Sequence, residues 1–354
     1  MEFDGLPLVM AWELTLACNL RCQHCGSAAG LPRRDELSLA EALDVCDQLP
    51  ALLVQEVDFT GGEPLVRPDW PQIAARLVKL GIRTQIITNS LALTPEVVAQ
   101  AKDVGICSFG FSLDGLEPTH DHIRGYPGLF QRVLASVEQV QQAGMRVAVI
   151  TTANRRNLGE LPDMLALLRS IGVNQWQLQP IFPLGRAQGC AELEMSPEGY
   201  MRLGDFVRTW ASAAAQAGFS IVLADSLGYG TEADPRQPPW NGCPAGLASC
   251  GITSDGKIKG CLSMPDDRVE GDLRQNDLWH IWFHPEAFAY NRRFTLDDLG
   301  PACRGCDRGD LCKGGCSAMS IGATGQYHGD PYCFYGITHR QSWTCAAQGA
   351  LRND

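Results

Sequence analysis

Cysteine is the feature that most constrains how this 354-residue chain can fold, because eleven of its fifteen cysteines gather in two groups. The first group occupies residues 18–25, and the second is spread over residues 243–333. The opening residues, MEFDGLPLVMAWEL, lack the basic start and long apolar run of an export signal, so a disulfide framework is not expected. Grouped thiolates in such a chain are typical of zinc or iron–sulfur sites, because soft sulfur suits these metals.

The charge balance and hydropathy limit the partners of the chain. It has 29 Lys and Arg against 40 Asp and Glu, and the resulting net charge of −11 repels a phosphate backbone. No uncharged apolar stretch reaches the roughly 18 residues of a membrane span. We therefore expect a soluble, cytoplasmic protein that binds neither nucleic acid nor membrane.

Strands and helices alternate over residues 9–225, which predicts an α/β fold with a parallel sheet. The runs rich in β-formers are 8–16, 54–60, 84–88, 106–112, 146–152 and 175–181. The helix-like stretches are 38–52, 69–80, 95–104, 128–143, 157–171 and 196–217. Six such units fit a partial (β/α)6 barrel of the TIM type, whose chemistry gathers at the carboxyl ends of the strands.

The character of the sequence changes after a Pro-rich polar stretch at 231–244, which reads as a linker. We expect a barrel domain at 1–230 and a second domain at 231–354. Cysteine and glycine are dense in the second domain, and only 278–283 and 341–352 look helical. A segment with so little regular structure needs cross-links, and bound metal would supply them.

The first cysteine group lies in the sequence ACNLRCQHC, directly after the first predicted strand. Cys18, Cys22 and Cys25 have the spacing C-x3-C-x2-C. One alternative is a zinc site with a distant fourth ligand, although zinc pairs are usually spaced C-x2-C. The other is a [4Fe–4S] cube held by three cysteines, which leaves one iron free to bind a small molecule.

This motif resembles the cluster loop of the radical S-adenosylmethionine (SAM) enzymes, in which an aromatic residue, here His24, usually precedes the third cysteine. The resemblance implies that the open iron binds the amino and carboxylate groups of SAM. Reduction of the cluster then cleaves SAM to a 5′-deoxyadenosyl radical that abstracts hydrogen from the substrate. The catalytic residues implied are Cys18, Cys22 and Cys25.

Further residues match the same family in order along the chain. Gly61, Gly62, Glu63 and Pro64 end the second strand, and glycine allows close approach of backbone to a ligand. By resemblance this segment meets the SAM amino group, and Ser112 and Arg124 contact its ribose or carboxylate. Alternatively, these residues form ordinary strand-end turns and a surface arginine. The cofactor-binding residues implied are His24, Gly61, Gly62, Glu63, Pro64, Asn89, Ser112, Arg124, Asn154 and Leu178.

The second cysteine group resembles the SPASM extension of radical SAM enzymes, with C-x12-G-x4-C followed by C-x2-C-x5-C-x3-C and a last cysteine. A zinc ribbon is the alternative, but it leaves several cysteines unused. The resemblance implies two auxiliary [4Fe–4S] clusters, and so three clusters in all. The first would use Cys243, Cys261 and Cys316, with Cys250 as its plausible fourth ligand; without Cys250, one iron would be open to contact substrate or take an electron. The second would use Cys303, Cys306, Cys312 and Cys333.

The resemblance also suggests a substrate class, because SPASM extensions mostly occur on enzymes that modify peptides. We expect C–H abstraction from a ribosomally made peptide, leading to crosslinking, decarboxylation, excision or epimerisation. Leu262 stands where sulfatase maturases carry an aspartate, which disfavours that activity. A separate peptide-recognition protein and a flavodoxin- or ferredoxin-type electron donor are the partners implied.

Two other functions stay open. The residues from Trp12 to Cys25 match the pattern W-E-x-T-x-x-C-N-L-x-C-x-H-C of haem-decarboxylase-like enzymes, so a tetrapyrrole is the alternative substrate. A non-catalytic iron–sulfur carrier belongs to a different class, but a carrier has no need of a SAM site.

The remaining cysteines and histidines carry weaker signals. We expect Cys46 and Cys107 to pack in the core. Cys190 or Cys345 could return hydrogen to a carbon radical, as a cysteine does in some peptide epimerases. His120 and His122 are expected on a loop, in a structural role.

Overall fold

The computed structural model describes residues 5–225 and 241–339. The predicted domain boundary at 230/231, residues 231–240 of the predicted linker, the predicted helix at 341–352 and Cys345 lie outside the described residues.

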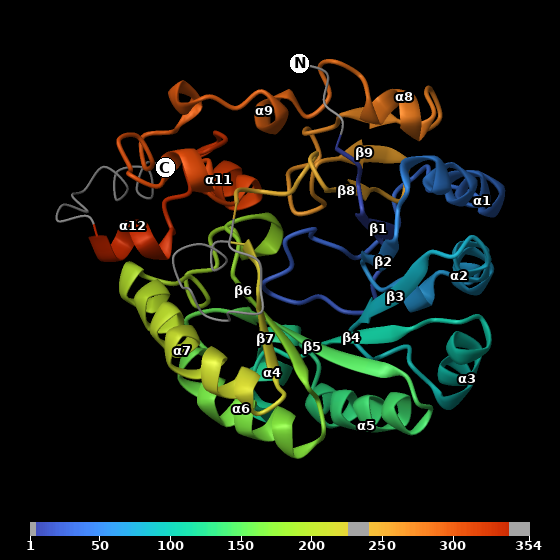
Figure 1. The fold of residues 1–354 in the computed structure, drawn as a ribbon. Helices are drawn as coiled ribbons and strands as arrows, with labels where there is room; N and C mark the ends of the chain where they lie inside the picture. The colour runs from blue at the N-terminus through green and yellow to red at the C-terminus, as the bar shows by residue number, and fades with distance from the viewer. Residues whose placement is uncertain (1–4, 226–240, 340–354) are drawn as a thin grey trace.

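Seven parallel strands form a curved sheet with helices on its outer side (Figure 1). They follow one another in chain order: β1 (Val9–Thr15), β2 (Glu56–Gly61), β3 (Arg83–Thr88), β4 (Ser108–Ser112), β5 (Arg146–Ala153), β6 (Gln175–Pro180) and β7 (Ser220–Leu223). The six predicted strands are therefore confirmed, and β7 adds a seventh. Among the described residues this open, partial barrel ends at β7 on one side, and on the other side the sheet continues beyond β1.

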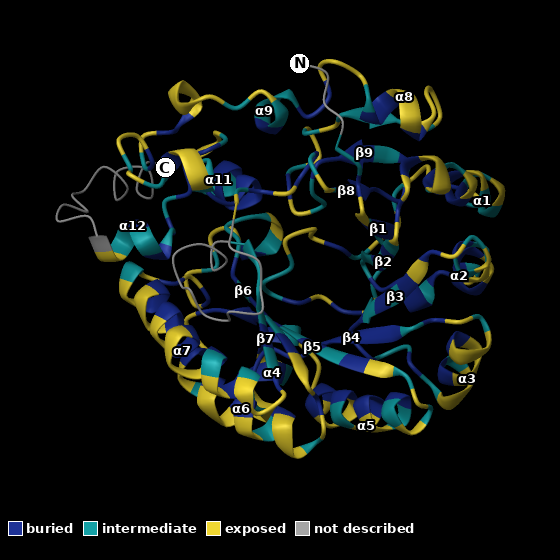
Figure 2. Cartoon of the chain, in the orientation of Figure 1, coloured by how far each residue is buried: buried dark blue, intermediate teal, exposed yellow. Residues whose placement is uncertain are grey.

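The outer layer consists mainly of helices that connect successive strands. They are α1 (Leu39–Gln48), α2 (Trp70–Lys79), α3 (Pro95–Asp103), α4 (Glu117–Arg124), α5 (Leu129–Gln142), α6 (Leu161–Ser170) and α7 (Pro197–Gln216). Short 3-10 turns are η1 (Leu49–Leu52), η2 (Pro64–Val66), η3 (Leu158–Glu160) and η4 (Gly185–Ala187). Figure 2 shows the helices buried on the side that faces the sheet and exposed on the other.

Local sequence explains where these elements begin. Helix α1 begins with a capping box: the Ser38 hydroxyl accepts from the Glu41 backbone, and the Glu41 carboxylate accepts from the Ser38 N–H at 2.8 Å. Strand β1 alternates between two faces, as the pleat requires. Met10 and Trp12 are fully buried, whereas Ala11 on the other face lines a cavity inside the barrel.

One loop expected from the sequence is a helix in the structure. His120 and His122 lie on α4, and His120 is fully buried. The prediction of a loop was wrong because the segment EPTHDHIR is too polar and too short to display a helical apolar stripe. Pro118 in its first turn and Gly125 in the left-handed conformation at its end mark the helix instead.

The C-terminal segment continues the sheet of the barrel. Strand β8 (Ser249–Ile252) pairs in parallel with β1, with Met10 opposite Cys250. β9 (Lys257–Lys259) and β10 (Gly271–Asp272) extend the same sheet outward, giving the order β10-β9-β8-β1-β2 at this edge. The sequence predicted no strand here, because the partner of β8 lies about 240 residues earlier in the chain.

Short helices and turns complete this segment across the top of Figure 1, from α8 on the right to α12 on the left. They are α8 (Leu278–Trp282), α9 (Ala289–Arg292), η6 (Leu296–Asp298), α10 (Gly309–Cys312), α11 (Ser317–Thr324) and α12 (Phe334–His339). The helix expected at 278–283 is thus confirmed as α8. Arg33 ties the two parts together, since its guanidinium binds Glu13 of β1 at 2.7 Å and Asp266 at 2.8 Å.

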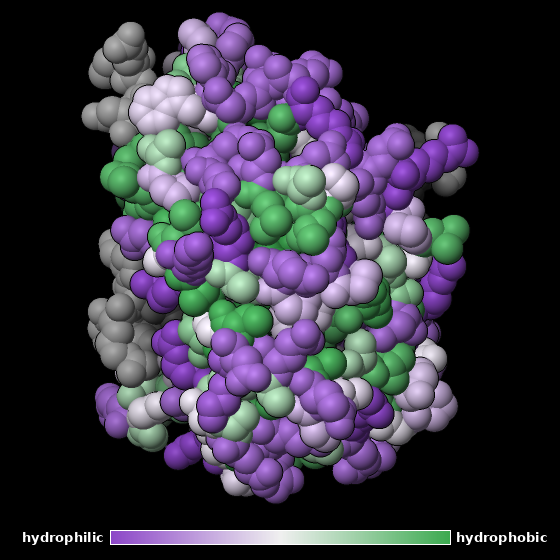
Figure 3. Space-filling model, turned by 90° about the vertical axis from the view of Figure 1, so that its right-hand side faces the viewer, coloured by the Kyte–Doolittle hydropathy of each residue, from purple (hydrophilic) through white to green (hydrophobic). Residues whose placement is uncertain are grey.

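The surface seen in Figure 3 is mostly hydrophilic, with small hydrophobic patches between the polar side chains. Within the described ranges, no helix is both long enough and apolar enough to cross a membrane.

Candidate functional site

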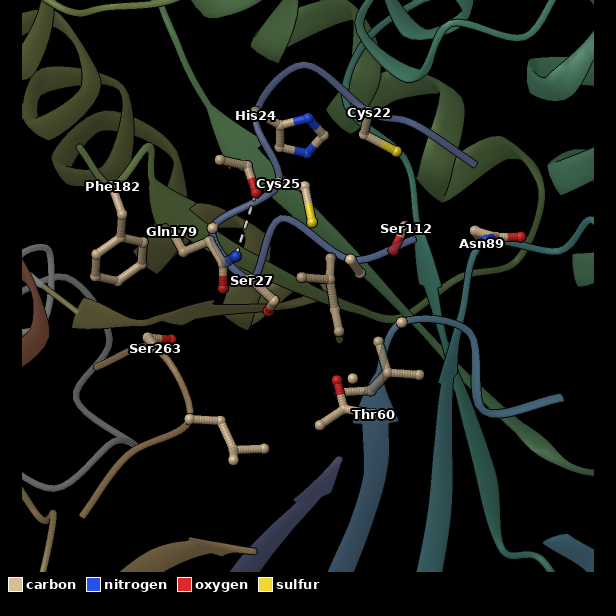
Figure 4. Close-up of a pocket in the computed structure, with 18 of the residues that line it drawn as sticks. Cys22, His24, Cys25, Ser27, Thr60, Asn89, Ser112, Gln179, Phe182 and Ser263 are labelled. Atoms are coloured by element: carbon tan, nitrogen blue, oxygen red, sulfur yellow. Dashed lines mark hydrogen bonds between the residues drawn. The ribbon is translucent and has the colours of Figure 1, made fainter. Parts of the chain in front are cut away.

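The loop after β1 brings the first three cysteines to one cavity. Cys18, Cys22 and Cys25 line a cavity of about 440 Å³, together with residues at the carboxyl ends of several strands (Figure 4). This size falls within the usual range of small-molecule sites. The cavity also reaches Cys261 and Asp225, which belong to the C-terminal segment and the end of β7.

Arg186 holds the cysteine loop in place. Its Nε donates to the Cys22 carbonyl and its Nη1 to the Ala29 carbonyl, both at 2.8 Å, and its backbone N–H donates to the Cys25 carbonyl at 3.0 Å. Gly185 is required beside it, because its φ is +56° and a Cβ there would lie 2.2 Å from the Gly26 carbonyl oxygen. The sequence analysis did not single out either residue, although both lie in the segment after the sixth strand.

Two polar side chains approach the thiols. Asn89, at the end of β3, places Nδ2 at 3.8 Å from the Cys18 sulfur, and Arg124 places Nη1 at 3.8 Å from the Cys22 sulfur. Both residues line the cavity. Donors at this distance stabilise negative charge on sulfur.

Asp114 anchors a buried charge network behind the cysteine loop. Its Oδ2 accepts from Arg124 Nη2 at 2.6 Å and lies 3.2 Å from His24 Nε2. Burial works against this carboxylate, but Arg124, His24 and His120 together hold the pKa of Asp114 well below its usual range. Burial, with the nearby Arg124 charge, lowers the pKa of His120 to about 4. The sequence analysis assigned no role to Asp114.

The segment after β2 fits closely against the cysteine loop. A Cβ at Gly62 would lie 2.1 Å from the Ala17 carbonyl oxygen, so only glycine fits there. Gly61 and Gly62 line the cavity, whereas Glu63 and Pro64 are buried behind it. Glu63 accepts from the Asn89 N–H at 2.8 Å, and burial raises the pKa of Glu63 to about 7 despite these hydrogen bonds.

The other predicted contact residues separate into two sets. Ser112 and His24 line the cavity. Asn154 and Leu178 do not line it, and both are fully buried. The Asn154 side chain is held by local hydrogen bonds instead, with Nδ2 donating to the Thr152 carbonyl at 2.9 Å.

The C-terminal cysteines form two groups in space. Charge on Cys243 raises the pKa of both Cys261 and Cys316, in addition to the larger effect of burial, so these three thiols lie together. The same argument applies to the second group. Burial and the charge of Asp330 raise the pKa of Cys333, and the charges of Cys312 and Cys303 raise it further. In addition to burial, the charge of Cys306 raises the pKa of Cys312. The second group therefore comprises Cys303, Cys306, Cys312 and Cys333.

Cys250 does not join the first of these groups. It lies on β8 opposite Met10, on the sheet face that points away from the cavity. Burial raises the pKa of its thiol to about 12, and the one charge recorded near it is that of Arg292. The role of Cys250 as a fourth ligand beside Cys243, Cys261 and Cys316 stays a prediction, and the register of β8 does not favour it. The side-chain alternation of β8 is the physical reason.

The weaker cysteine predictions have different outcomes. Cys46 is fully buried on α1, as expected, and Cys107 is half-buried with its sulfur 3.2 Å from the Thr84 carbonyl oxygen. Cys190 does not line the cavity, so the structure gives it no place beside a substrate there.

The donor sets fit polynuclear clusters better than zinc. No three His, Cys, Asp or Glu side chains in 5–225 and 241–339 are arranged to hold a single metal ion. A zinc ion needs ligands that converge at about 2.0–2.3 Å, whereas each cysteine of a cube binds a separate iron. Burial raises the pKa of Cys18 and of Cys261 to about 11, and buried thiolates need a positive partner such as iron.

Comparison with known proteins agrees with this arrangement. The model of the radical SAM superfamily matches residues 12–168, and that of the SPASM iron–sulfur cluster-binding domain matches residues 243–307. The AdoMet-dependent heme synthase of Methanosarcina barkeri is 31% identical over 351 residues, which cover 95% of this chain and 98% of that protein. The chain belongs to the radical SAM superfamily and carries a SPASM domain.

This radical SAM enzyme is also similar to a protein named as a maturase and to a solved structure. The mycofactocin maturase MftC of Mycolicibacterium smegmatis is 30% identical and covers 93% of this chain and 83% of that protein. Among solved structures, Streptococcus suis SuiB bound to S-adenosylmethionine has a TM-score of 0.75 at 17% identity, covering 93% of this chain and 77% of SuiB. That likeness concerns the fold. The chain is thus a radical SAM enzyme with iron–sulfur clusters and SAM as its cofactors.

Proposed function

We propose that this chain is a radical maturase that removes hydrogen from a C–H bond of a peptide. The observation that carries the proposal is the charge of the cavity. Its two lining arginines are already engaged, Arg124 by Asp114 and Arg186 by backbone carbonyls, and no other described lining residue is Arg or Lys. The His24 imidazole, which also lines the cavity, is engaged by Asp114 as well. A cavity without a spare cation suits a largely neutral substrate such as a peptide segment.

In this proposal Cys18, Cys22 and Cys25 hold the cluster that binds SAM. Cluster and SAM together supply the carbon radical that abstracts hydrogen. The chain positions them: Arg186 fixes the cysteine loop, Arg124 places positive charge beside Cys22, and the Gly61–Gly62 backbone makes room for SAM. The apolar walls from Ile87, Ile150, Phe182 and Leu184 would exclude water from the reacting carbon.

Two further clusters complete the proposed cofactor set, one in each C-terminal cysteine group. Cys261 lines the cavity, so the group that contains it lies where it would meet the bound substrate. An electron donor of the flavodoxin or ferredoxin type and a separate peptide-recognition protein remain proposed partners.

Tetrapyrrole modification is the second candidate. The relation to the heme synthase of Methanosarcina barkeri favours it, since that match spans 98% of the relative. A carboxylate-bearing porphyrin would need cationic partners for its acidic side chains, and the described lining residues offer none that is unengaged. Charge therefore favours the peptide.

Iron analysis and SAM cleavage test the machinery. After anaerobic reconstitution we expect about twelve irons in the wild type and about eight in the Cys18→Ala/Cys22→Ala/Cys25→Ala variant, with 5′-deoxyadenosine formed by the wild type alone. About four irons in the wild type would contradict three clusters. If the wild type holds all its iron but does not cleave SAM, the result would favour the electron-carrier function.

Substrate titration separates the two candidates. We expect no change in the porphyrin absorption bands when Fe-coproporphyrin III is added to the loaded protein. Stoichiometric porphyrin binding with SAM-dependent loss of carboxyl groups would overturn the peptide proposal. A peptide encoded beside the gene should lose hydrogen or gain a crosslink detectable by mass spectrometry.

A further inference from the structure

The group of Cys243, Cys261 and Cys316 contains three thiols, and a cube has four irons. A carboxylate lies beside these thiols. Asp225 Oδ1 is 3.7 Å from the Cys316 sulfur, within donating distance of that thiol. Asp225 and Cys261 line the same cavity as the first cysteine group.

The backbone at Asp225 is held in an unusual conformation. Its φ is +58°, in the left-handed region that a residue other than glycine seldom adopts. Aspartate tolerates this region better than most residues, and such strain gathers at ligand and active sites. The turn directly after β7 thus directs the carboxylate to the thiols.

The Cys250 side chain lies on the face of the sheet away from the cavity. On β1, Ala11 and Glu13 face the cavity, so their neighbours on β8 at the same register do too. Gly251 is the β8 residue opposite Ala11, and a Cβ there would lie 2.7 Å from the cavity-lining Leu262 side chain. Cys250 stands one position earlier and therefore on the opposite face.

Asp330 is the other carboxylate near these thiols. Its Oδ1 accepts from the Tyr332 N–H at 2.8 Å, and its backbone N–H donates to the Gly314 carbonyl at 3.1 Å, close in the chain to Cys312 of the second group. Asp330 does not line the cavity that Asp225 and Cys261 share.

We propose that Asp225, and not Cys250, is the fourth protein ligand of the cluster held by Cys243, Cys261 and Cys316. The inference rests on the proposed function, which gives these cysteines a cluster. On metal binding the Cys316 thiol and the Asp225 carboxyl are both deprotonated, and a carboxylate oxygen donates a lone pair to the fourth iron. Oxygen is a harder and weaker ligand for iron than sulfur, so the iron held by Asp225 would be the one that most readily exchanges its protein ligand.

The test uses the full-length Cys18→Ala/Cys22→Ala/Cys25→Ala chain, which isolates the auxiliary clusters, loaded with 57Fe and examined by Mössbauer and EPR spectroscopy. We expect about one iron in eight to show the larger isomer shift of an oxygen-bound site. Asp225→Cys should keep the iron content and convert that subsite to an all-sulfur signal. Cys250→Ala, the matched control, should leave both spectra unchanged.

Asp225→Asn tests the ligand without changing the size of the side chain, and circular dichroism checks that the variants fold. We expect Asp225→Asn to change the EPR signal of the reduced cluster. An unchanged spectrum in Asp225→Asn, or a loss of about four irons in Cys250→Ala, would overturn the proposal. A parent chain with no auxiliary iron at all would instead remove the proposed three-cluster function, and this inference with it.

Discussion

Arg124 is the residue whose charge matters most to the fold of the site. It neutralises the fully buried Asp114 and reaches the Cys22 sulfur. Removing one partner of a buried ion pair leaves an uncompensated charge, which typically costs roughly 3–5 kcal/mol. We expect Arg124→Ala to lower the free energy of unfolding by that amount, measured by anaerobic urea denaturation.

The matched control for this prediction is Arg156, whose ion pair with Glu192 lies at the surface. Surface pairs are worth about 1 kcal/mol or less. Equal losses of stability in Arg124→Ala and Arg156→Ala would contradict the prediction, because the buried Asp114 network would then stabilise the fold no more than a surface ion pair does.

Glu63 gives the site a dependence on pH. Its pKa in the folded chain, about 7, lies above the ordinary value of 4.5. The folded chain therefore binds more protons than the unfolded chain between these values, and the free energy of unfolding falls as the pH rises from about 4.5 to about 7. We expect Glu63→Gln to remove roughly 3 kcal/mol of this fall, measured by urea denaturation across the interval. The exposed Glu138→Gln variant should keep the slope of the wild type; a Glu63→Gln slope that matches it would contradict the burial argument.

At the scale of elements, the turn η4 and the cysteine loop depend on each other. We expect Gly185→Ala to push the turn away from Gly26, because the new Cβ has no room, and so to release the carbonyls that Arg186 holds. Iron content should fall from about twelve toward about eight, and formation of 5′-deoxyadenosine should fall with it.

Gly189 offers the control for that change, since it shares a positive φ of +76° but has no atom within 4 Å of its hypothetical Cβ. Gly189→Ala should cost only the backbone strain, about 1–2 kcal/mol, and keep its iron. Parallel iron losses in both variants would attribute the effect to strain rather than to contact with the cysteine loop.

The sequence predicted the elements whose signals are local and missed those that depend on distant pairing. Strands β1–β6 were readable because apolar runs alternate with helical stretches. β8 was not, because its strand character depends on β1, far away in the chain. The spacing of the cysteines indicated their chemistry, but spacing does not determine on which face of a strand a side chain lies. The spacing therefore indicated Cys250 as a ligand, and no motif marks Asp225.

At the scale of the whole molecule, the C-terminal segment protects an edge of the sheet. Without β8, strand β1 would expose its N–H and C=O groups, which promotes pairing between chains. We expect a chain truncated to residues 1–225 to aggregate in size-exclusion chromatography, whereas the full chain does not. Ala11→Lys in the truncated chain places a charge on the inner face of that edge and should reduce aggregation. Aggregation that Ala11→Lys leaves unchanged would point to another exposed surface.

The hold of Arg186 on the cysteine loop has a consequence for the order of events during synthesis. The side chain that binds the Cys22 carbonyl belongs to Arg186, which is translated 164 residues after Cys22. Until Arg186 has been translated, the loop that carries Cys18, Cys22 and Cys25 lacks the side chain that fixes its conformation. The final shape of this loop can therefore form only after most of the barrel has been translated.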